Sequence, residues 1–106
     1  MESKEKATRK NKGVSEYYEH NILIDEVRLV GETSLVVKNF YVGMVNSIAE
    51  EIQVLFHRYH LYELDYNDYE MVATTGEETV LLDRRMYVED YMDLLENTTL
   101  LTVRPI

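Results

Sequence analysis

The 106-residue sequence predicts a single α+β domain in which one main helix packs on a mixed β-sheet. Two segments with alternating apolar residues, 22–30 and 34–42, predict a hairpin at the start. A segment with apolar residues at helical spacing follows, and then two short strands, a short helical segment and a closing strand. The predicted order is therefore strand, strand, helix, strand, strand, short helix, strand.

The first hairpin has one irregular position. Apolar residues alternate along segment 22–30, but the phase slips near Asp25 and Glu26, where a β-bulge would fit. Residues 31–33 supply the turn, and segment 34–42 is rich in β-branched and aromatic residues that favour strands.

The main helix is predicted over residues 44–60, directly after Gly43 breaks the second strand. Apolar residues recur every three or four positions, at Val45, Ile48, Ile52, Leu55 and Tyr59. Polar residues occupy the other side, at Asn46, Glu50, Glu51 and Gln53. An apolar stripe of this kind needs a sheet or another helix to cover it.

Three tyrosines, Tyr62, Tyr66 and Tyr69, continue the helical spacing beyond this segment. A long coiled-coil seam, and dimerisation through it, is therefore an alternative to a single short helix. Residues 65–68 carry turn chemistry, which favours an end of the helix near residue 61. Most of the tyrosines are expected at the rim of the core, with one or two exposed in a binding surface.

In the second half of the chain, turn residues separate short segments with strand or helix patterns. Two strands are expected at residues 69–73 and 79–82, with a tight turn at 75–77 between them. Residues 88–95 suit one or two helical turns. The last strand is expected at 100–103, before Pro105 prevents its continuation.

The net charge of −9 is unevenly distributed. Residues 1–12 hold five basic and two acidic side chains, a net charge of +3, whereas residues 63–96 hold eleven acidic side chains and two arginines, a net charge of −9. Residues 1–16 are expected to form a disordered charged tail, and residues 17–106 the folded domain. The folded part would repel nucleic acid and anionic lipid, so a protein with a basic surface is the expected partner.

No cysteine, no membrane-spanning apolar run and no secretory signal is present, which predicts an intracellular protein, cytoplasmic or nuclear. His57, His60 and Glu63 are spaced three apart, but they are more typical of a helix surface than of a metal site. Because no nucleophile motif or phosphate-binding loop occurs, we expect no catalytic residue, no metal and no cofactor. An enzyme or ligand carrier would need a concave pocket with converging polar groups.

Four segments resemble the Ras-association family: HRYHL at 57–61, DYEMV at 68–72, GEETVLLD at 76–83 and LLTVR at 100–104. This resemblance implies a ubiquitin-like β-grasp fold and an adaptor that binds GTP-loaded small GTPases by extending its sheet with the first two strands. Under this hypothesis Arg28 and Lys38 contribute to affinity.

Two further families show a similar sequence. Residues 69–105 are similar to the ubiquitin-like domain of Polycomb RING proteins, and residues 89–101 to the N-terminal domain of apoptotic DNA-fragmentation factors. The second resemblance implies head-to-tail assembly through opposed charged faces. The alternative function is therefore homotypic or heterotypic assembly through an acidic face, formed by Glu77, Glu78, Glu89, Asp90 and Asp93.

Overall fold

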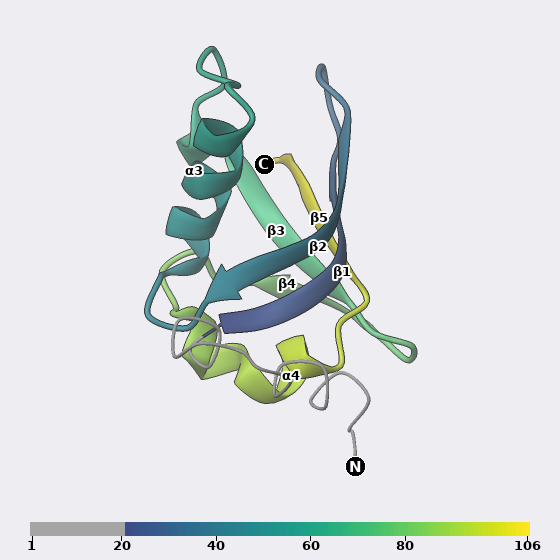
Figure 1. Ribbon diagram of the computed structural model, residues 1–106. Coiled ribbons are helices and arrows are strands. Elements are labelled where there is room, and N and C mark those ends of the chain that lie inside the picture. The colour runs from purple at the N-terminus through teal and green to yellow at the C-terminus, as the bar shows by residue number, and fades with distance from the viewer. Residues whose placement is uncertain (1–20) are drawn as a thin grey trace.

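The computed structural model describes residues 21–106 (Figure 1), so the predicted tail and the predicted first four residues of the domain lie outside the described part. The elements are β1 (Asn21–Leu29), β2 (Leu35–Gly43), α3 (Ile48–Arg58), η1 (Tyr66–Asp68), β3 (Tyr69–Thr74), β4 (Thr79–Leu82), η2 (Val88–Tyr91), α4 (Met92–Glu96) and β5 (Leu100–Pro105). The predicted order of strands and helices is confirmed.

The five strands form one mixed sheet in the order β2-β1-β5-β3-β4. β1 and β5 run parallel, and the other neighbouring pairs are antiparallel. Figure 1 shows α3 crossing one face of this sheet, while α4 lies beside the start of β1. The topology is that of a ubiquitin-like β-grasp domain, as predicted.

The core lies between α3 and the sheet. Ile48, Ile52 and Leu55 of α3 are almost completely buried, and so are Leu101 and Val103 at the centre of β5. Burying a side chain of this size stabilises the fold by about 1.5–3 kcal/mol. The apolar stripe of the helix is therefore covered by its own sheet, as an amphipathic helix requires.

The helix begins at Ile48, four residues later than predicted. Ser47 is the N-cap: its Oγ accepts the N–H of Glu50 at 3.1 Å, and Glu50 Oε1 accepts the N–H of Ser47 at 2.7 Å. Val45 therefore precedes the helix, and its side chain is 74% exposed rather than part of the apolar stripe. The sequence Ser47-x-x-Glu50 is a capping-box signal that marks this start.

The sequence-based prediction placed Glu51 and Tyr59 on the wrong faces of the helix. Glu51 was expected on the polar side but is buried. Tyr59, expected on the apolar side, is the partly exposed C-cap, and Phe56 is buried in the core instead. Phe56 packs edge-to-face against Tyr69 of β3, with the ring centroids 5.0 Å apart.

The extended tyrosine seam is not helical. α3 ends at Arg58, and His60 has a left-handed φ of 60° that ends the helical path. Tyr62 is exposed in the following loop, whereas Tyr69 is buried in β3. A coiled coil through these residues is therefore contradicted, and the tyrosines divide between core and surface.

The β1–β2 hairpin bends where the phase slip was predicted. Ile24 faces Phe40 and Glu26 faces Lys38, so the pairing keeps the same register on both sides of Asp25 and Asn39. Neither strand gains a residue, and the predicted β-bulge is therefore wrong. Instead Asn39 adopts a left-handed φ of 57°, and the buried set changes phase in both strands together.

The last strand continues two residues further than expected. Arg104 and Pro105 pair with Glu70 and Tyr69 of β3, but the pairing of β5 with β1 ends at Val103. Pro105 lacks an N–H, and it is tolerated here because it lies beyond the β1 pairing. The second hairpin and the helical turns around residues 88–95 agree with the prediction.

Replacing Asn39 tests the bend. Asn39→Val should lower the free energy of unfolding by about 1–2 kcal/mol, because a β-branched residue disfavours the left-handed conformation. Asn39→Gly is the matched control and should change it by less than about 0.5 kcal/mol. Urea unfolding measures both variants, and equal losses for valine and glycine would contradict a role for the backbone conformation.

Candidate functional site

The two predicted basic residues lie side by side on the β1–β2 ribbon. Lys38 Nζ donates to Glu26 Oε1 at 2.6 Å, and Arg28 Nε donates to Glu26 Oε2 at 3.1 Å. Arg28 Nη2 also contacts Glu26 Oε2. The structure therefore brings Arg28 and Lys38 together, but one carboxylate lies between them.

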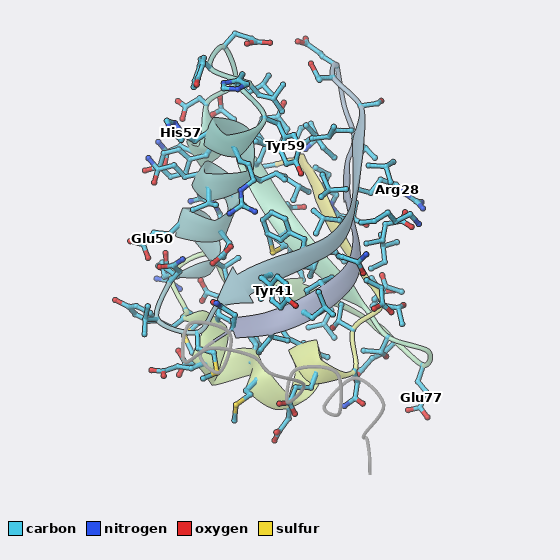
Figure 2. The ribbon with its side chains drawn as sticks, viewed as in Figure 1. Arg28, Tyr41, Glu50, His57, Tyr59 and Glu77 are labelled. Atoms are coloured by element: carbon cyan, nitrogen blue, oxygen red, sulfur yellow. The ribbon has the colours of Figure 1, made fainter. Side chains whose placement is uncertain are left out.

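This carboxylate changes what the basic pair presents to a partner. Hydrogen bonds from Lys38 and then Arg28 hold the pKa of Glu26 below its usual value, so Glu26 is charged at neutral pH. The group of three residues therefore carries a single net positive charge. It lies at the edge of the sheet, and Figure 2 shows Arg28 pointing away from α3.

A row of side chains crosses the outer face of the sheet, which is the face opposite α3. The strand registers align Val36, Arg28, Thr102, Val72 and Leu81 from one edge to the other. Val36 and Leu81, at the two edge strands, are 54% and 55% exposed. Sequence reasoning did not single out this row, because the register that aligns it comes from five strands far apart in the chain.

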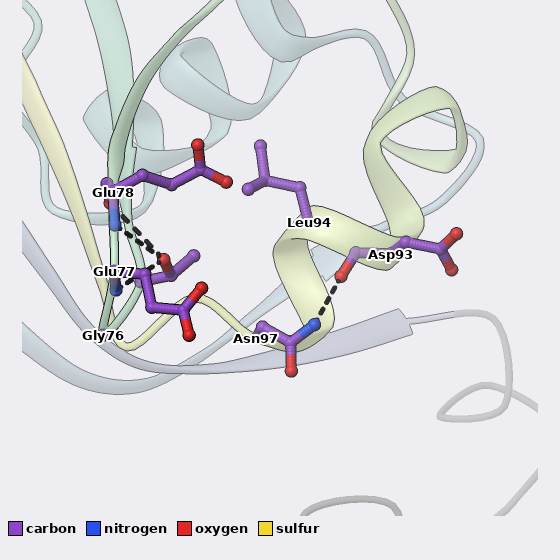
Figure 3. Close-up of a pocket in the computed structure, with 7 residues that line it drawn as sticks. Gly76, Glu77, Glu78, Asp93, Leu94 and Asn97 are labelled. Carbon is purple, nitrogen blue, oxygen red and sulfur yellow. Dashed lines mark hydrogen bonds between the residues drawn. The ribbon is translucent and has the colours of Figure 1, made fainter.

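The predicted acidic residues Glu77 and Glu78 lie on the tight turn between β3 and β4. Thr75 Oγ1 accepts the N–H groups of both residues at 3.1 Å, and the N–H of Thr75 donates to Glu78 O at 2.9 Å. These bonds hold the turn while both acidic residues stay exposed (Figure 3).

The same turn faces α4 across an open groove of about 650 Å³. We call it the turn groove; it is lined by Thr75, Gly76, Glu77, Glu78, Asp93, Leu94 and Asn97. Asn97 Nδ2 donates to Asp93 O at 2.9 Å on the helix side. Figure 3 shows the carboxylate of Asp93 directed away from Glu77 and Glu78, so the three acids border the groove without converging on one point.

Glu89, Asp90 and Asp93 border a second, smaller groove of about 320 Å³ that also includes Leu94. Asp93 and Leu94 belong to both grooves, so the grooves adjoin and each of the five predicted acids lines at least one of them. Asp90 has a structural role as well, because its Oδ2 accepts the N–H of Tyr87 at 2.9 Å and caps η2.

An exposed apolar patch lies where two loops pair. The N–H of Ile48 donates to Met86 O at 2.9 Å, the N–H of Val88 donates to Asn46 O at 2.8 Å, and Ser47 and Tyr87 form an isolated β-bridge. We call the exposed residues of these loops and the adjoining start of α4 the loop patch: Val45, Met86, Tyr87 and Met92. The sequence did not predict it, because Val45 was assigned to the helix stripe.

Behind these loops lies a buried carboxylate. Glu51 is only 2% exposed, and its Oε2 accepts the N–H of Gly43 and the Nδ2 of Asn46, each at 2.8 Å. Its Oε1 has no hydrogen-bond partner within the described structure. Burial raises the pKa of Glu51, and the two hydrogen bonds only partly oppose this effect. The carboxylate ties the end of β2 to the loop that precedes α3.

The predicted histidine positions are exposed at the end of α3. His60 Nδ1 lies 2.8 Å from the hydroxyl of Tyr62, whose ring also packs edge-on against His57. Among residues 21–106, histidines and carboxylates do not gather in groups of three or more that could hold a metal ion. No helix in this part of the chain is long and apolar enough to cross a membrane.

Comparison with known proteins supports the fold. No protein-family model and no curated protein matches the sequence. The structure is similar to the C-domain of the Hsp90 co-chaperone Cns1 from Saccharomyces cerevisiae, with a TM-score of 0.50 and 8% sequence identity. The match covers 83% of this chain and 62% of that chain, so this chain spans less than two thirds of that structure. At this identity the likeness concerns the fold alone.

Replacing Glu51 tests the buried charge. The raised pKa means that the folded protein binds a proton at a higher pH than the unfolded chain, so this group stabilises the fold less as the pH rises. Relative to Glu51→Gln, the wild type should therefore gain stability as the pH falls from 7 towards the unfolded-state pKa of about 4.3. The gain is about 1.4 kcal/mol for each unit by which the pKa is raised.

Urea unfolding of both proteins at several pH values between 7 and 4.5 measures this difference. Glu63→Gln is the matched control, because it removes the same kind of charge from an exposed position instead of a buried one. A constant difference for Glu51→Gln would contradict burial of a charged group at this position.

Proposed function

We propose that this domain is a non-catalytic adaptor whose acidic face binds a basic surface of a partner protein. The observation that carries this proposal is that the turn groove and the smaller groove adjoin and are lined by five acids. These five acids come from two separate segments, 77–78 and 89–93, which lie near each other because Thr74 pairs with Leu100 and accepts the N–H of Thr99. Within residues 21–106, histidines and carboxylates form no group of three or more that could hold a metal ion.

The grooves combine charge with apolar surface. Exposed ion pairs each contribute only about 0.2–1 kcal/mol, so charge alone gives orientation and fast association rather than high affinity. Leu94 lies in both grooves, and the partly exposed Met92 lies in the smaller one. These side chains can bury apolar surface in a complex. A suitable partner segment therefore alternates basic and apolar side chains.

The partner can be a different protein or a second copy of this chain. In the second case the basic pair Arg28 and Lys38 of one copy would meet the acidic face of the next, which gives head-to-tail assembly. The likeness to a domain of an Hsp90 co-chaperone makes Hsp90 one defined partner to include in binding assays.

Neutralising the acidic face tests the proposal. The triple variant Glu77→Gln, Glu78→Gln and Asp93→Asn should weaken binding to a captured partner at least tenfold, because basic side chains of the partner lose their counter-charges. Affinity of the wild type should also fall as salt rises from 50 to 300 mM, because the charges are exposed. Affinity capture followed by calorimetry provides the measurement.

A matched control removes three other exposed charges, with Glu32→Gln, Glu63→Gln and Asp68→Asn, and should change affinity less than twofold. Sedimentation of the wild type separates self-assembly from binding to another protein. Equal losses in the two triple variants would show that only total charge matters, and the acidic face would then have no specific role.

A second candidate function is recognition of a GTP-loaded small GTPase by the β1–β2 ribbon. The observation that favours it is the position of β2 at the edge of the sheet, where an added strand can pair with its backbone. Arg28 and Lys38 lie beside this edge, but Glu26 offsets one of their two charges. The charge balance therefore supports this candidate less than the acidic face.

Glu26 gives this candidate a sharp test. Glu26→Gln should strengthen binding of a GTP-loaded GTPase about fivefold or more, because it frees both cations for the acidic switch region, and Lys38→Ala should weaken it. Titration with GTP-loaded and GDP-loaded Ras-family proteins provides the measurement. Equal or absent binding of the two nucleotide forms would rule out GTPase recognition.

A further inference from the structure

The loop patch lies close to the point where residues 1–20 join the fold. Asn21, the first residue of β1, pairs with Gly43, and Val45 of the loop patch follows two residues after Gly43. β1 also packs against α4, which carries Met92 and Asp93. Asn21, to which residues 1–20 are attached, therefore lies near an exposed apolar surface that has acids next to it.

The sequence of residues 1–20 complements this surface in the right order. Tyr17 and Tyr18 are four and three residues before Asn21, and Val14 is seven residues before it. Glu16 and Glu19 flank the two tyrosines. Further from Asn21, residues 1–12 hold a net charge of +3, from five basic residues, Lys4, Lys6, Arg9, Lys10 and Lys12, and the two acids Glu2 and Glu5. Along the sequence, the aromatic residues of the segment are therefore closer to Asn21, and the cluster of cations is further from it.

The distances allow this arrangement. A chain extends at most about 3.3–3.6 Å per residue, so Lys12 can lie up to about 30 Å from Asn21 and Lys4 up to about 60 Å. The longest dimension of the domain is 40 Å. Because the segment is covalently attached, its effective concentration at the loop patch is on the order of millimolar, and weak contacts suffice to populate a docked state.

We propose that residues 1–20 dock on the loop patch, with Tyr17 and Tyr18 against Val45 and Met92 and the basic residues beside Glu89 and Asp93, and that they compete there with a basic partner. The competition rests on the proposed function, whereas the docking does not. A segment that occupies the surface nine tenths of the time weakens an outside partner about tenfold. Removal or modification of the segment then regulates partner binding.

The absence of cysteine from the chain gives a direct test. Ala7→Cys in the full chain carries a single nitroxide spin label in the middle of the basic residues, outside the described fold. Paramagnetic broadening of methyl signals is then measured at Val45, Met86 and Met92. Val36 and Leu81 on the outer face of the sheet serve as reference positions that are equally accessible.

At low salt the label should broaden the loop-patch methyl signals at least twice as much as those of Val36 and Leu81. The contrast should disappear at about 0.5 M salt, where charges are screened within a few ångströms. Equal broadening at both sets of positions, or stronger broadening on the outer face, would overturn the proposal.

Charge variants separate specific docking from general attraction. In the labelled chain, Glu89→Gln with Asp93→Asn should remove the contrast in broadening between the loop patch and the outer face. The control pair Glu63→Gln with Asp68→Asn should keep this contrast. Loss of the contrast in both pairs would overturn the proposed site. Asp90 is left unchanged because it caps η2.

The failures of the two proposals are distinguishable. A labelled segment that broadens the loop patch while no basic partner is captured supports docking and removes the proposed adaptor function. A captured partner together with no contrast in broadening removes the docking alone. If both hold, deleting residues 2–20 should raise partner affinity about tenfold relative to the full chain, and an unchanged affinity would overturn the competition.

Discussion

The packing of α3 against the sheet is the interaction on which the other features depend. Ile52 of the helix and Leu101 of β5 are fully buried in the same core, and β5 joins β1 to β3 across the centre of the sheet. The positions of the surrounding turns and helices depend on this core. It positions the β3–β4 turn across a groove from α4, so that two acidic segments become neighbours. On the opposite face of the sheet, Val36 and Leu81 are exposed on the two edge strands.

Glu51 shows that the core tolerates one charged group at its border. Its carboxylate accepts hydrogen bonds from Gly43 at the end of β2 and from Asn46 in the β2–α3 loop, which keeps that loop in place. Burial outweighs these bonds and the nearby charge of Arg58, so it reduces the stability that the charged group contributes at neutral pH. The loop in turn pairs with the segment that carries Met86 and Tyr87. The burial of Glu51 therefore lowers the stability of the fold, but its hydrogen bonds fix the position of the loops at the surface.

Most of the elements could be predicted because each has a clear local pattern in the sequence. Apolar residues alternate in the strands and recur every three or four positions in the helix, and turn residues separate the elements. The sequence predicted the acidic residues as a set, but not that they line two grooves, because their proximity depends on the pairing of β3 with β5, which are far apart in the chain. The helix start was misplaced since Val45 fits the apolar spacing while Ser47 and Glu50 supply the stronger capping signal. Glu51 was placed on the wrong face of the helix, because an argument from hydrophobic periodicity assigns every charged residue to the exposed side.

The position of β5 has a consequence for how the domain forms during synthesis. The central strand of the sheet is the last one in the chain, and its pairing with β1 joins residues more than 70 positions apart. On the ribosome, β1 and β2 can pair early, but the core cannot close until the final strand has emerged. Contacts of such long sequence separation slow folding. Until then the apolar faces of α3 and the first hairpin stay accessible to chaperones and to other chains.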